Sequence, residues 1–241
     1  MKLLVEGACH LGINLTPGQT EQFEAYYRLL AEWNHRINLT SVIDYDEVQV
    51  KHFLDSMAVI TALEGSMDNR GAGLDIIDVG AGAGLPGVAV KIVLDRSRLV
   101  LLDSVGKKTT FIKEVVRQLG LADVEVINTR AEDAARLPQY REKFGIVLAR
   151  ALAKMPVLAE LTLPFCRIGG TVIAQKKGDF SAELAEAASA IKLLGGRIRE
   201  NRRVELKELS DNRYLVVLEK VAATPAGYPR QAGTPKKRPI K

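Results

Sequence analysis

One stretch sets the fold of this chain: Asp78-Val79-Gly80-Ala81-Gly82-Ala83-Gly84-Leu85-Pro86-Gly87. Its four glycines let the backbone turn sharply and approach a ligand closely, because no Cβ stands in the way. Proline suits position 86 if a helix begins there, since the first helical turn needs no backbone N–H at that point. An ordinary turn between a strand and a helix needs fewer glycines. The stretch therefore predicts a cofactor-binding loop that follows a strand and opens a helix.

Short apolar runs alternate with longer segments of helical spacing around this loop. Strands are expected at 75–79, 99–102, 124–127, 146–148 and 171–174, and helices at 87–94, 104–119, 156–166 and 181–194. That alternation predicts a parallel sheet with helices on both faces. Segments 203–209 and 213–219, joined by a turn at 210–212, are expected to form a closing antiparallel hairpin. This α/β arrangement is typical of the Rossmann-like class I methyltransferases, which use S-adenosylmethionine.

Two helical segments are expected before the sheet. Thr16-Pro17-Gly18-Gln19 combines a capping threonine, a proline at the first helical position and a glutamine three residues on, and Asp44 to Glu47 repeats the capping pattern. Trp33 lies on an apolar stripe and is expected in the core. We expect an N-terminal helical extension packed on the core (1–65), a methyltransferase domain (66–220) and a basic C-terminal tail (221–241).

The net charge of the chain is concentrated in that tail. The 241 residues include 34 basic and 29 acidic ones, a formal net charge of +5. The whole excess comes from five tail residues, Arg230, Lys236, Lys237, Arg238 and Lys241. A segment that cannot bury a core of its own fits a solubilising, disordered end. It fits an arm that contacts nucleic-acid phosphates equally well, and charge alone leaves both interpretations open.

Composition excludes several classes of protein. The two cysteines, Cys9 and Cys166, form no CxxC pair, so neither a disulfide framework nor a zinc site is expected. No apolar run approaches the roughly 20 residues that span a bilayer, and residues 1–16 lack the layout of a signal peptide. We expect a cytoplasmic protein that binds no metal and no membrane.

The glycine loop also fits an NAD(P)-dependent oxidoreductase. Residues 82–87 match the GxGxxG fingerprint of dinucleotide folds, and Asp103 follows about 20 residues later, as that fingerprint requires. Asp78 argues against this alternative, because a carboxylate beside the loop repels a pyrophosphate and attracts a sulfonium or an ammonium group. The closing hairpin is not expected of a dinucleotide fold either. We favour a methyltransferase and keep the oxidoreductase as the alternative.

Three acidic or small residues are candidates for holding a cofactor. Asp103 ends the second expected strand, where its carboxylate can accept both hydrogen bonds of a ribose diol. Capping of the following helix is its alternative task. Ala131 and Glu132 follow the third expected strand, where an adenine would lie. For Glu132 a solvated acidic turn is the alternative.

The fourth expected strand ends at Arg150, and this residue limits which atom could accept a methyl group. No Asp/Asn-Pro-Pro-aromatic element is present to polarise an exocyclic amine, and Cys166 is expected in a later helix rather than at the site. An arginine cannot act as a general base at neutral pH, although it can bind a base edge, a phosphate or a cofactor carboxylate. This favours an acceptor that is nucleophilic without deprotonation, such as N7 of guanine. A structural ion pair with a nearby acid is the alternative for Arg150.

Together these motifs resemble one family, the bacterial guanine-N7 methyltransferases of small-subunit (16S) ribosomal RNA, also called ribosomal RNA small subunit methyltransferase G or glucose-inhibited division protein B. The motifs follow the family's order and spacing over most of the chain. They are Asn38-Leu39-Thr40, 51–56, 78–87, Leu102-Asp103-Ser104 with Lys107-Lys108, Arg150-Ala151, Gly169-Gly170 with Lys176-Lys177-Gly178, and Tyr228-Pro229-Arg230 to Pro239. Where the family often has a hydroxyl residue, this chain has Ala81 and Ala149.

The resemblance implies S-adenosylmethionine as the cofactor and methyl transfer to N7 of a guanine in 16S ribosomal RNA, nucleotide 527 in the decoding-region loop. The loop analysis and the resemblance together give these cofactor-binding candidates: Asp78, Gly80, Gly82, Leu85, Asp103, Ser104, Ala131, Glu132 and Arg150. The candidates for the transfer step are Arg150, Arg130 and Lys107. The candidates for RNA contact are Lys108, Lys176, Arg213, Arg230, Lys236, Lys237 and Arg238.

The implied partner is 16S ribosomal RNA or the small ribosomal subunit, bound by a monomer. For Lys107, Lys108, Lys176 and Lys177 a solvated surface position stays open as the alternative. A noncatalytic RNA-binding assembly factor on the same fold is a third functional hypothesis. The intact cofactor loop argues against it.

Overall fold

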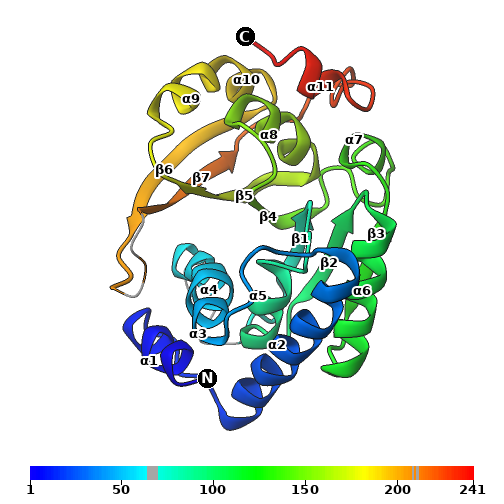
Figure 1. Ribbon diagram of the computed structural model, residues 1–241. Coiled ribbons are helices and arrows are strands. Elements are labelled where there is room, and N and C mark those ends of the chain that lie inside the picture. The colour runs from blue at the N-terminus through cyan, green and yellow to red at the C-terminus, as the bar shows by residue number, and fades with distance from the viewer. Residues whose placement is uncertain (64–69, 208, 210–211) are drawn as a thin grey trace.

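A single mixed sheet organises the part of the chain that the computed structural model describes, residues 1–63, 70–207, 209 and 212–241 (Figure 1). Its strands are β1 (Asp75–Val79), β2 (Arg98–Asp103), β3 (Val124–Asn128), β4 (Phe144–Arg150), β5 (Cys166–Lys177), β6 (Gly196–Val204) and β7 (Arg213–Lys220). Their order in the sheet is β3-β2-β1-β4-β5-β7-β6. Strands β1 to β5 are parallel, and β7 runs antiparallel to both β5 and β6. The predicted parallel sheet with an antiparallel closing pair is confirmed.

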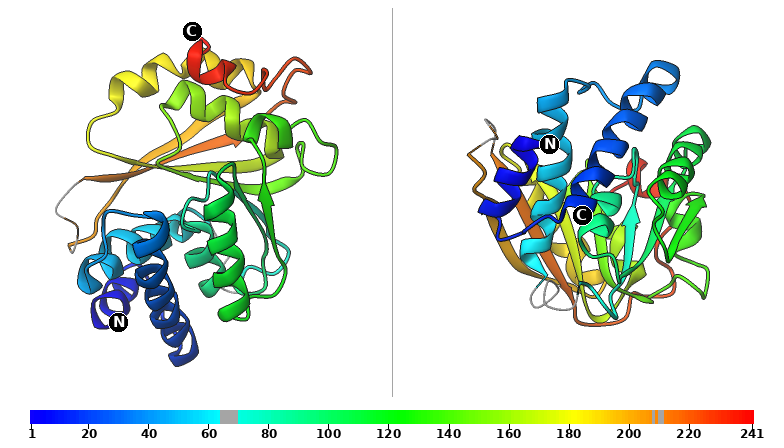
Figure 2. Two further views of the ribbon diagram at one scale, coloured as in Figure 1. Left: turned by 45° about the vertical axis from the view of Figure 1, so that its right-hand side comes forward. Right: turned by 90° about the horizontal axis from the view of Figure 1, so that it is seen from below.

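Helices cover both faces of this sheet. From β1, Ile76 enters the core on one face and Ile77 the core on the other, because successive side chains of a strand point to opposite sides. The first face carries α5 (Gly87–Val93) and α6 (Gly106–Gln118) beside the N-terminal helices. The second carries α7 (Ala131–Ala134), α8 (Met155–Thr162), α9 (Ser181–Glu186) and α10 (Ala188–Leu193), so that the sheet lies between two helical layers (Figure 2).

The N-terminal helical extension packs on the first face. Its helices are α1 (Lys2–His10), α2 (Pro17–Ile37), α3 (Tyr45–Val48) and α4 (Asp55–Met57), with a π-helical stretch, Gln49–Leu54, before α4 and a 3-10 stretch, Ala58–Ala62, after it. The predicted capping box is confirmed, since the Thr16 side chain accepts from the Gln19 N–H and the Gln19 side chain accepts from the Thr16 N–H. Trp33 packs on Phe111 with ring centroids 5.6 Å apart. Helix α1 was not predicted, because no capping pattern precedes it.

The predicted helix over 156–166 is too long. Helix α8 ends at Thr162, and a 3-10 turn, Leu163–Phe165, follows it. Pro164 lacks the N–H that would continue the α-helix. Cys166 therefore begins β5 instead of lying in a helix, which corrects our expectation. It is buried, and burial raises the pKa of its thiol to about 12, so it does not supply a thiolate nucleophile.

The first arm of the predicted hairpin is also displaced. We expected it at 203–209, whereas β6 spans Gly196–Val204 and pairs with β7 from Gly196 opposite Lys220 to Val204 opposite Arg213. Most side chains of β6 are exposed or half-buried and several are arginines, which hides the apolar pattern of a strand. Two residues of the predicted turn at 210–212, residues 210 and 211, lie outside the described part of the chain, as does the expected boundary between 1–65 and 66–220.

The C-terminal tail is folded against the body rather than extended into solvent. Its short helix α11 (Thr234–Lys237) lies against α8, and Thr224 and Pro235 are buried (Figure 1). The disordered end that composition left open is therefore not what the structure shows. The backbone of this segment finds its hydrogen-bond partners on the body, as a segment without a core of its own must if it is to be ordered.

Lys220 joins the last strand to three other segments. It has no exposed surface, and its Nζ donates to the carbonyl oxygens of Leu163 at 3.0 Å and Leu194 at 3.1 Å, at the ends of α8 and α10. It also donates to the Thr224 hydroxyl and pairs with Glu142 at 3.1 Å. Burial lowers the pKa of Lys220, while the hydrogen bond to Glu142 opposes this shift.

Lys220→Ala is expected to lower the free energy of unfolding by about 3 kcal/mol, because it leaves buried acceptors and the Glu142 carboxylate without their donor. Urea denaturation at neutral pH measures this change. Lys192→Ala, at an exposed position on α10, is the control and is expected to change stability by no more than about 0.5 kcal/mol. Equal effects of the two substitutions would contradict this account of Lys220.

Candidate functional site

A large cavity of about 890 Å³ opens at the carboxyl ends of the parallel strands. It lies where β1 is flanked by β2 on one side and β4 on the other, the point at which α/β sheets bind ligands. Its walls come from the segments that follow β1, β2, β3 and β4, from α8 and from the tail. The lining residues are Gly80, Leu102, Asp103, Ser104, Val105, Lys108, Thr129, Arg130, Ala131, Glu132, Ala151, Leu152, Ala153, Lys154, Pro156, Val157, Leu161, Glu186, Gly233, Pro235, Lys236 and Pro239.

The glycine loop leaves β1 and passes under this cavity. Gly80 has φ +76°, and a Cβ there would come within 2.6 Å of the Leu152 side chain, so only glycine fits. At Gly84, with φ +87°, a Cβ would come within 2.9 Å of the Tyr26 hydroxyl. That hydroxyl donates to the Ala83 carbonyl, so helix α2 of the N-terminal extension braces the loop directly.

Asp78 lies beneath the loop rather than in the cavity. Its side chain has no exposed surface, and Oδ2 accepts the Gly87 N–H at 2.8 Å, which ties the end of β1 to the start of α5. Oδ1 has no hydrogen-bond partner within the described residues. Burial raises the pKa of this carboxyl to about 7, against the lowering effects of the Gly87 hydrogen bond and of Arg150. The direct contact that we expected between Asp78 and a cofactor is therefore not provided by this arrangement.

Asp103 stands at the cavity wall with both carboxylate oxygens held in place. Oδ2 accepts the Gly82 N–H at 2.9 Å, and Oδ1 accepts the Val105 N–H at 2.8 Å. The capping task is not found, since the N-cap of α6 is Val105 and no side-chain cap is formed there. Asp103 instead joins the glycine loop to the residue that precedes α6. Each oxygen keeps a further lone pair, because a carboxylate has about four acceptor sites. Asp103 can therefore still accept hydrogen bonds from a bound diol.

Glu132 lines the cavity at the start of α7 and has a partner that the sequence did not suggest. Its Oε1 accepts the N–H of Gly233, in the tail, at 2.8 Å. Gly233, Pro235, Lys236 and Pro239 of the tail line the same cavity. Tail residues were expected to contact RNA, and nothing in their local pattern predicted that they would line this cavity. Among the expected cofactor residues, Gly80, Asp103, Ser104, Ala131 and Glu132 lie together at this cavity.

Arg150 is engaged by the N-terminal extension. Its guanidinium donates to the carbonyl oxygens of Lys51 at 3.0 Å and His52 at 3.1 Å and to the Ser56 hydroxyl at 2.8 Å. It also pairs with Asp55, N to O 3.4 Å. The structural ion pair that the sequence left open for Arg150 is thus present. Each Nη group has two hydrogen-bond partners, because Nη2 also contacts His52 Nδ1, and the side chain remains 17% exposed.

A second cavity of about 290 Å³ lies beside Arg150. It shares Ala151, Leu152 and Ala153 with the large cavity, so these three residues separate the two spaces. The carboxyl end of β5 and the start of β7 supply its polar wall. The remaining lining residues include Asp55, Gln175, Lys176, Lys177, Asp179, Glu183 and Arg213. Arg213 pairs with Asp55 at 3.2 Å, and Lys176 pairs with Glu183.

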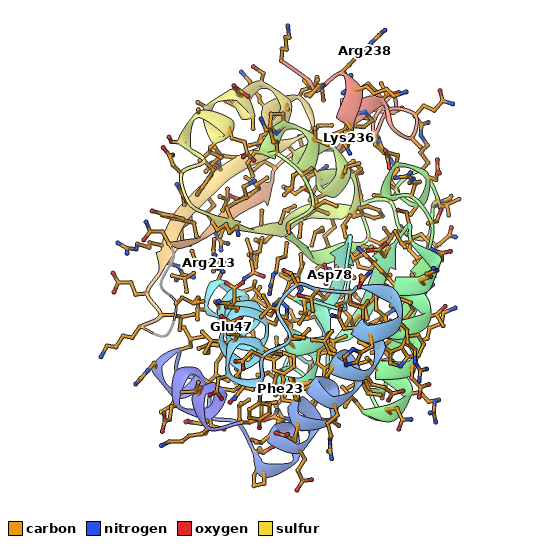
Figure 3. The ribbon with its side chains drawn as sticks, in the orientation of Figure 1. Phe23, Glu47, Asp78, Arg213, Lys236 and Arg238 are labelled. Carbon is orange, nitrogen blue, oxygen red and sulfur yellow. The ribbon has the colours of Figure 1, made fainter. Side chains whose placement is uncertain are left out.

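The basic residues expected at the transfer step or in contact with RNA differ in their surroundings. Of the transfer candidates, Arg130 lines the large cavity and Lys107 is exposed. Of the RNA candidates, Lys108 and Lys236 line the large cavity, and Lys237 and Arg238 are exposed, with Arg238 pointing away from the body (Figure 3). Arg230 instead makes a bidentate ion pair with Glu160, which has no exposed surface. The geometry gives Arg230 a structural task, and any contact of Arg230 with RNA would have to be made while it is paired with Glu160.

Neither a membrane-spanning helix nor a metal-binding cluster is found among the described residues. No helix there is long and apolar enough to cross a membrane. No group of three or more His, Cys, Asp and Glu side chains there could hold a metal ion.

Known proteins similar to this chain share its fold, and those similar in sequence carry one family name. Residues 19–210 match the family model described as rRNA small subunit methyltransferase G. Ribosomal RNA small subunit methyltransferase G of Dehalococcoides mccartyi strain BAV1 is 49% identical over 241 residues, all of both chains. The protein of that name from Desulforamulus reducens is 42% identical over 98% of this chain and 97% of its own.

Solved structures share the fold at low sequence identity. A SAM-dependent methyltransferase from Aquifex aeolicus superposes with a TM-score of 0.55 at 17% identity, over 76% of this chain and 97% of its own. The [4+2]-cyclase SpnF superposes with a TM-score of 0.53 at 14% identity, over 70% of this chain and 82% of its own. Because a cyclase shares the fold, the fold alone does not fix the reaction.

The contacts of His52 predict a pH dependence of stability. Nδ1 lies 3.1 Å from both the Arg150 guanidinium and the Lys51 carbonyl oxygen, and Nε2 lies 2.8 Å from the Thr40 hydroxyl. A ring that carries no charge fits beside the guanidinium. Burial and then Arg150 lower the pKa of His52 from 6.5 to about 4. Because the folded pKa lies below the unfolded one, stability from the neutral ring is present above pH 6.5 and is lost as pH falls toward 4.

His52→Gln removes this titration, so the wild type is expected to lose about 2 kcal/mol more stability than the variant between pH 7 and pH 4.5. Urea unfolding at both pH values measures the difference. His35→Gln, at an exposed position of α2, is the control and is expected to follow the wild type. Parallel losses in the wild type and His52→Gln would show that His52 titrates normally in the folded state.

Proposed function

The chain belongs to the rRNA small subunit methyltransferase G family, and we propose that it transfers a methyl group from S-adenosylmethionine to N7 of a guanine in 16S ribosomal RNA. The observation that carries the proposal is the pairing of two adjoining cavities at the ends of β1 and β4. The large cavity is suited to the cofactor and the small one to a single base. They share residues 151–153 of their lining, and we place the methyl group of the cofactor and its acceptor on the two sides of this boundary.

The residues around the large cavity fit S-adenosylmethionine. Asp103 presents unshared lone pairs to a ribose diol, and the glycine at position 80 keeps the loop clear of a Cβ where the cofactor would lie closest. The Ala131 backbone and Glu132 are the groups available to an adenine. When bound, the cofactor supplies a methyl group made electrophilic by its sulfonium centre.

The second cavity fits an acceptor that needs no base. Arginine does not act as a general base, and Arg150 and Arg213 both line this cavity. The carboxylates of the lining are engaged: Asp55 with both arginines, Glu183 with Lys176, and Asp179 with Ser181. The N7 atom of guanine would accept the methyl group on its own lone pair, so no residue of the chain would have to remove a proton from the base. The protein then contributes orientation of the base and exclusion of water. Arginine N–H groups suit the O6 edge of guanine, next to N7.

Basic side chains around the large cavity support an RNA partner. Lys107, Lys108, Arg130, Lys236 and Arg238 lie at the cavity or on the nearby surface. Phosphate contacts of this kind orient a nucleic acid and make its binding depend on salt. Lys176 is paired with Glu183, and its contact with RNA would need that pair to open. Binding as a monomer remains a prediction.

The oxidoreductase alternative loses its support. It rested on the GxGxxG pattern and on Asp103, and both features serve a methyltransferase loop equally well. The family match and the antiparallel β7 argue for methyl transfer. A noncatalytic assembly factor is the remaining rival, and the transfer experiment below separates it from an enzyme.

Asp103→Asn is expected to raise the dissociation constant for S-adenosylmethionine at least about tenfold, because it removes the charge that strengthens hydrogen bonds to the ribose diol. Isothermal calorimetry without RNA measures it. Asp133→Asn removes the same charge from an exposed position of α7 and is expected to stay within about twofold of the wild type. Equal constants for all three proteins would contradict the assignment of Asp103.

Methyl incorporation tests the reaction itself. The protein is incubated with methyl-labelled S-adenosylmethionine and with small ribosomal subunits, or their 16S RNA, that lack the modification. We expect label in one guanine, and strand cleavage specific for N7-methylguanine should map it. Binding of RNA without incorporation would support the noncatalytic factor. Label on another atom or base would contradict the N7 assignment.

A further inference from the structure

The C-terminal segment, residues 224–239, is fastened to the body along its length. Arg141 donates to the carbonyl oxygens of Thr224 and Tyr228, both at 2.8 Å, and Arg136 donates to that of Pro229 at 2.6 Å. These donors come from the body, and the acceptors are backbone atoms of the segment. The path of the segment is therefore fixed by its main chain and not only by its side chains.

A buried ion pair holds the middle of the C-terminal segment. Glu160 of α8 has no exposed surface and accepts from the Arg230 backbone N–H at 2.8 Å and from its Nη2 at 2.6 Å. The Arg230 side chain is 27% exposed and stacks near the Tyr228 ring, 6.0 Å from its centroid. A buried carboxylate without these donors would be costly, so the pair ties the segment to α8.

Beyond this pair the segment turns into the cavity wall. Gly233, at φ +83°, donates its N–H to Glu132 Oε1 at 2.8 Å. Pro235, which is buried, and Pro239 bring apolar surface to the cavity beside Lys236. Glu132 is itself 7% exposed and faces the same space. The Glu132 carboxylate therefore connects α7 with the C-terminal segment at the wall of the cavity.

We propose that the C-terminal segment is part of the cofactor site: it forms the wall next to α7 and holds Glu132 in the orientation that the cofactor meets. This inference rests on the proposed function, since it takes the large cavity as the site of S-adenosylmethionine. It gives the segment a task in the absence of RNA, which differs from the phosphate-binding arm expected from its charge. Gly233 and Pro235 act as positioning residues, and the Gly233 N–H fixes Glu132.

Gly233→Pro is the test variant, because proline has no N–H for Glu132 and cannot adopt φ +83°. Gly120→Pro is the matched control: Gly120 has φ +61°, donates its N–H to Arg117, and, like Gly233, would place a Cβ in open space. It lies at the end of α6, away from the lining of the cavity.

Calorimetry without RNA is expected to give a dissociation constant for S-adenosylmethionine about tenfold higher for Gly233→Pro than for the wild type. Gly120→Pro is expected to bind like the wild type. Equal affinity of Gly233→Pro and the wild type overturns the inference and leaves the proposed function intact. Failure of the wild type to bind S-adenosylmethionine contradicts the proposed function itself.

A second measurement uses the unaltered chain and does not depend on how well a variant folds. Hydrogen–deuterium exchange of the peptides that cover residues 228–239 is compared with and without saturating S-adenosylmethionine. We expect slower exchange at Gly233 and its neighbours when the cofactor is bound, because a wall that contacts the cofactor opens less often. Unchanged exchange in this segment, together with slower exchange around Asp103, overturns the inference.

Discussion

The two cavities lie at the point where the order of the parallel strands reverses, between β1 and β4. The chain builds β1, β2 and β3 outward and then returns to place β4 against the free side of β1. Connections thus depart on opposite sides of the β1–β4 pair, and the carboxyl ends of these strands stay open. The glycine loop, Asp103, the Ala131 turn and Arg150 each end or follow one of the strands around this opening. Their proximity is a property of the topology.

Buried charged groups fix the positions of segments that the order of the strands does not determine. Asp78, Glu160 and Lys220 have essentially no exposed surface, and each bonds to the backbone of a segment distant in the chain or across a turn. Burying such groups is costly unless they are paired or hydrogen-bonded. Each therefore favours one placement of its partner segment: the start of α5 for Asp78, the tail for Glu160, and the ends of α8 and α10 for Lys220.

Sequence patterns predicted the central strands of the sheet accurately and the outer strand β6 poorly. The range of β1 was predicted residue for residue, because an apolar run between an acid and a glycine admits few interpretations. Strand β6 was misplaced, since its exposed arginines follow no apolar alternation. The position of Arg150 at the end of β4 was right, but its partners lie some 94 to 99 residues earlier, and no local pattern encodes them. The same holds for the tail, whose anchors on Arg136, Arg141 and Glu160 are long-range contacts.

The exposed arginines of β6, which made the strand hard to predict, also affect how two molecules of this protein can associate. Strand β6 is the outer strand on its side of the sheet, and an outer strand offers unpaired backbone groups to any other strand that arrives. A register irregularity between Ile198 and Glu200 bends its hydrogen-bonding edge, and Arg197, Arg199 and Arg203 add like charges along it. Charged side chains and a local irregularity both make an outer strand a poorer template for pairing with another strand. The residues that made β6 hard to predict therefore also disfavour association of the sheet through this edge, even though Arg197 is paired with Glu219.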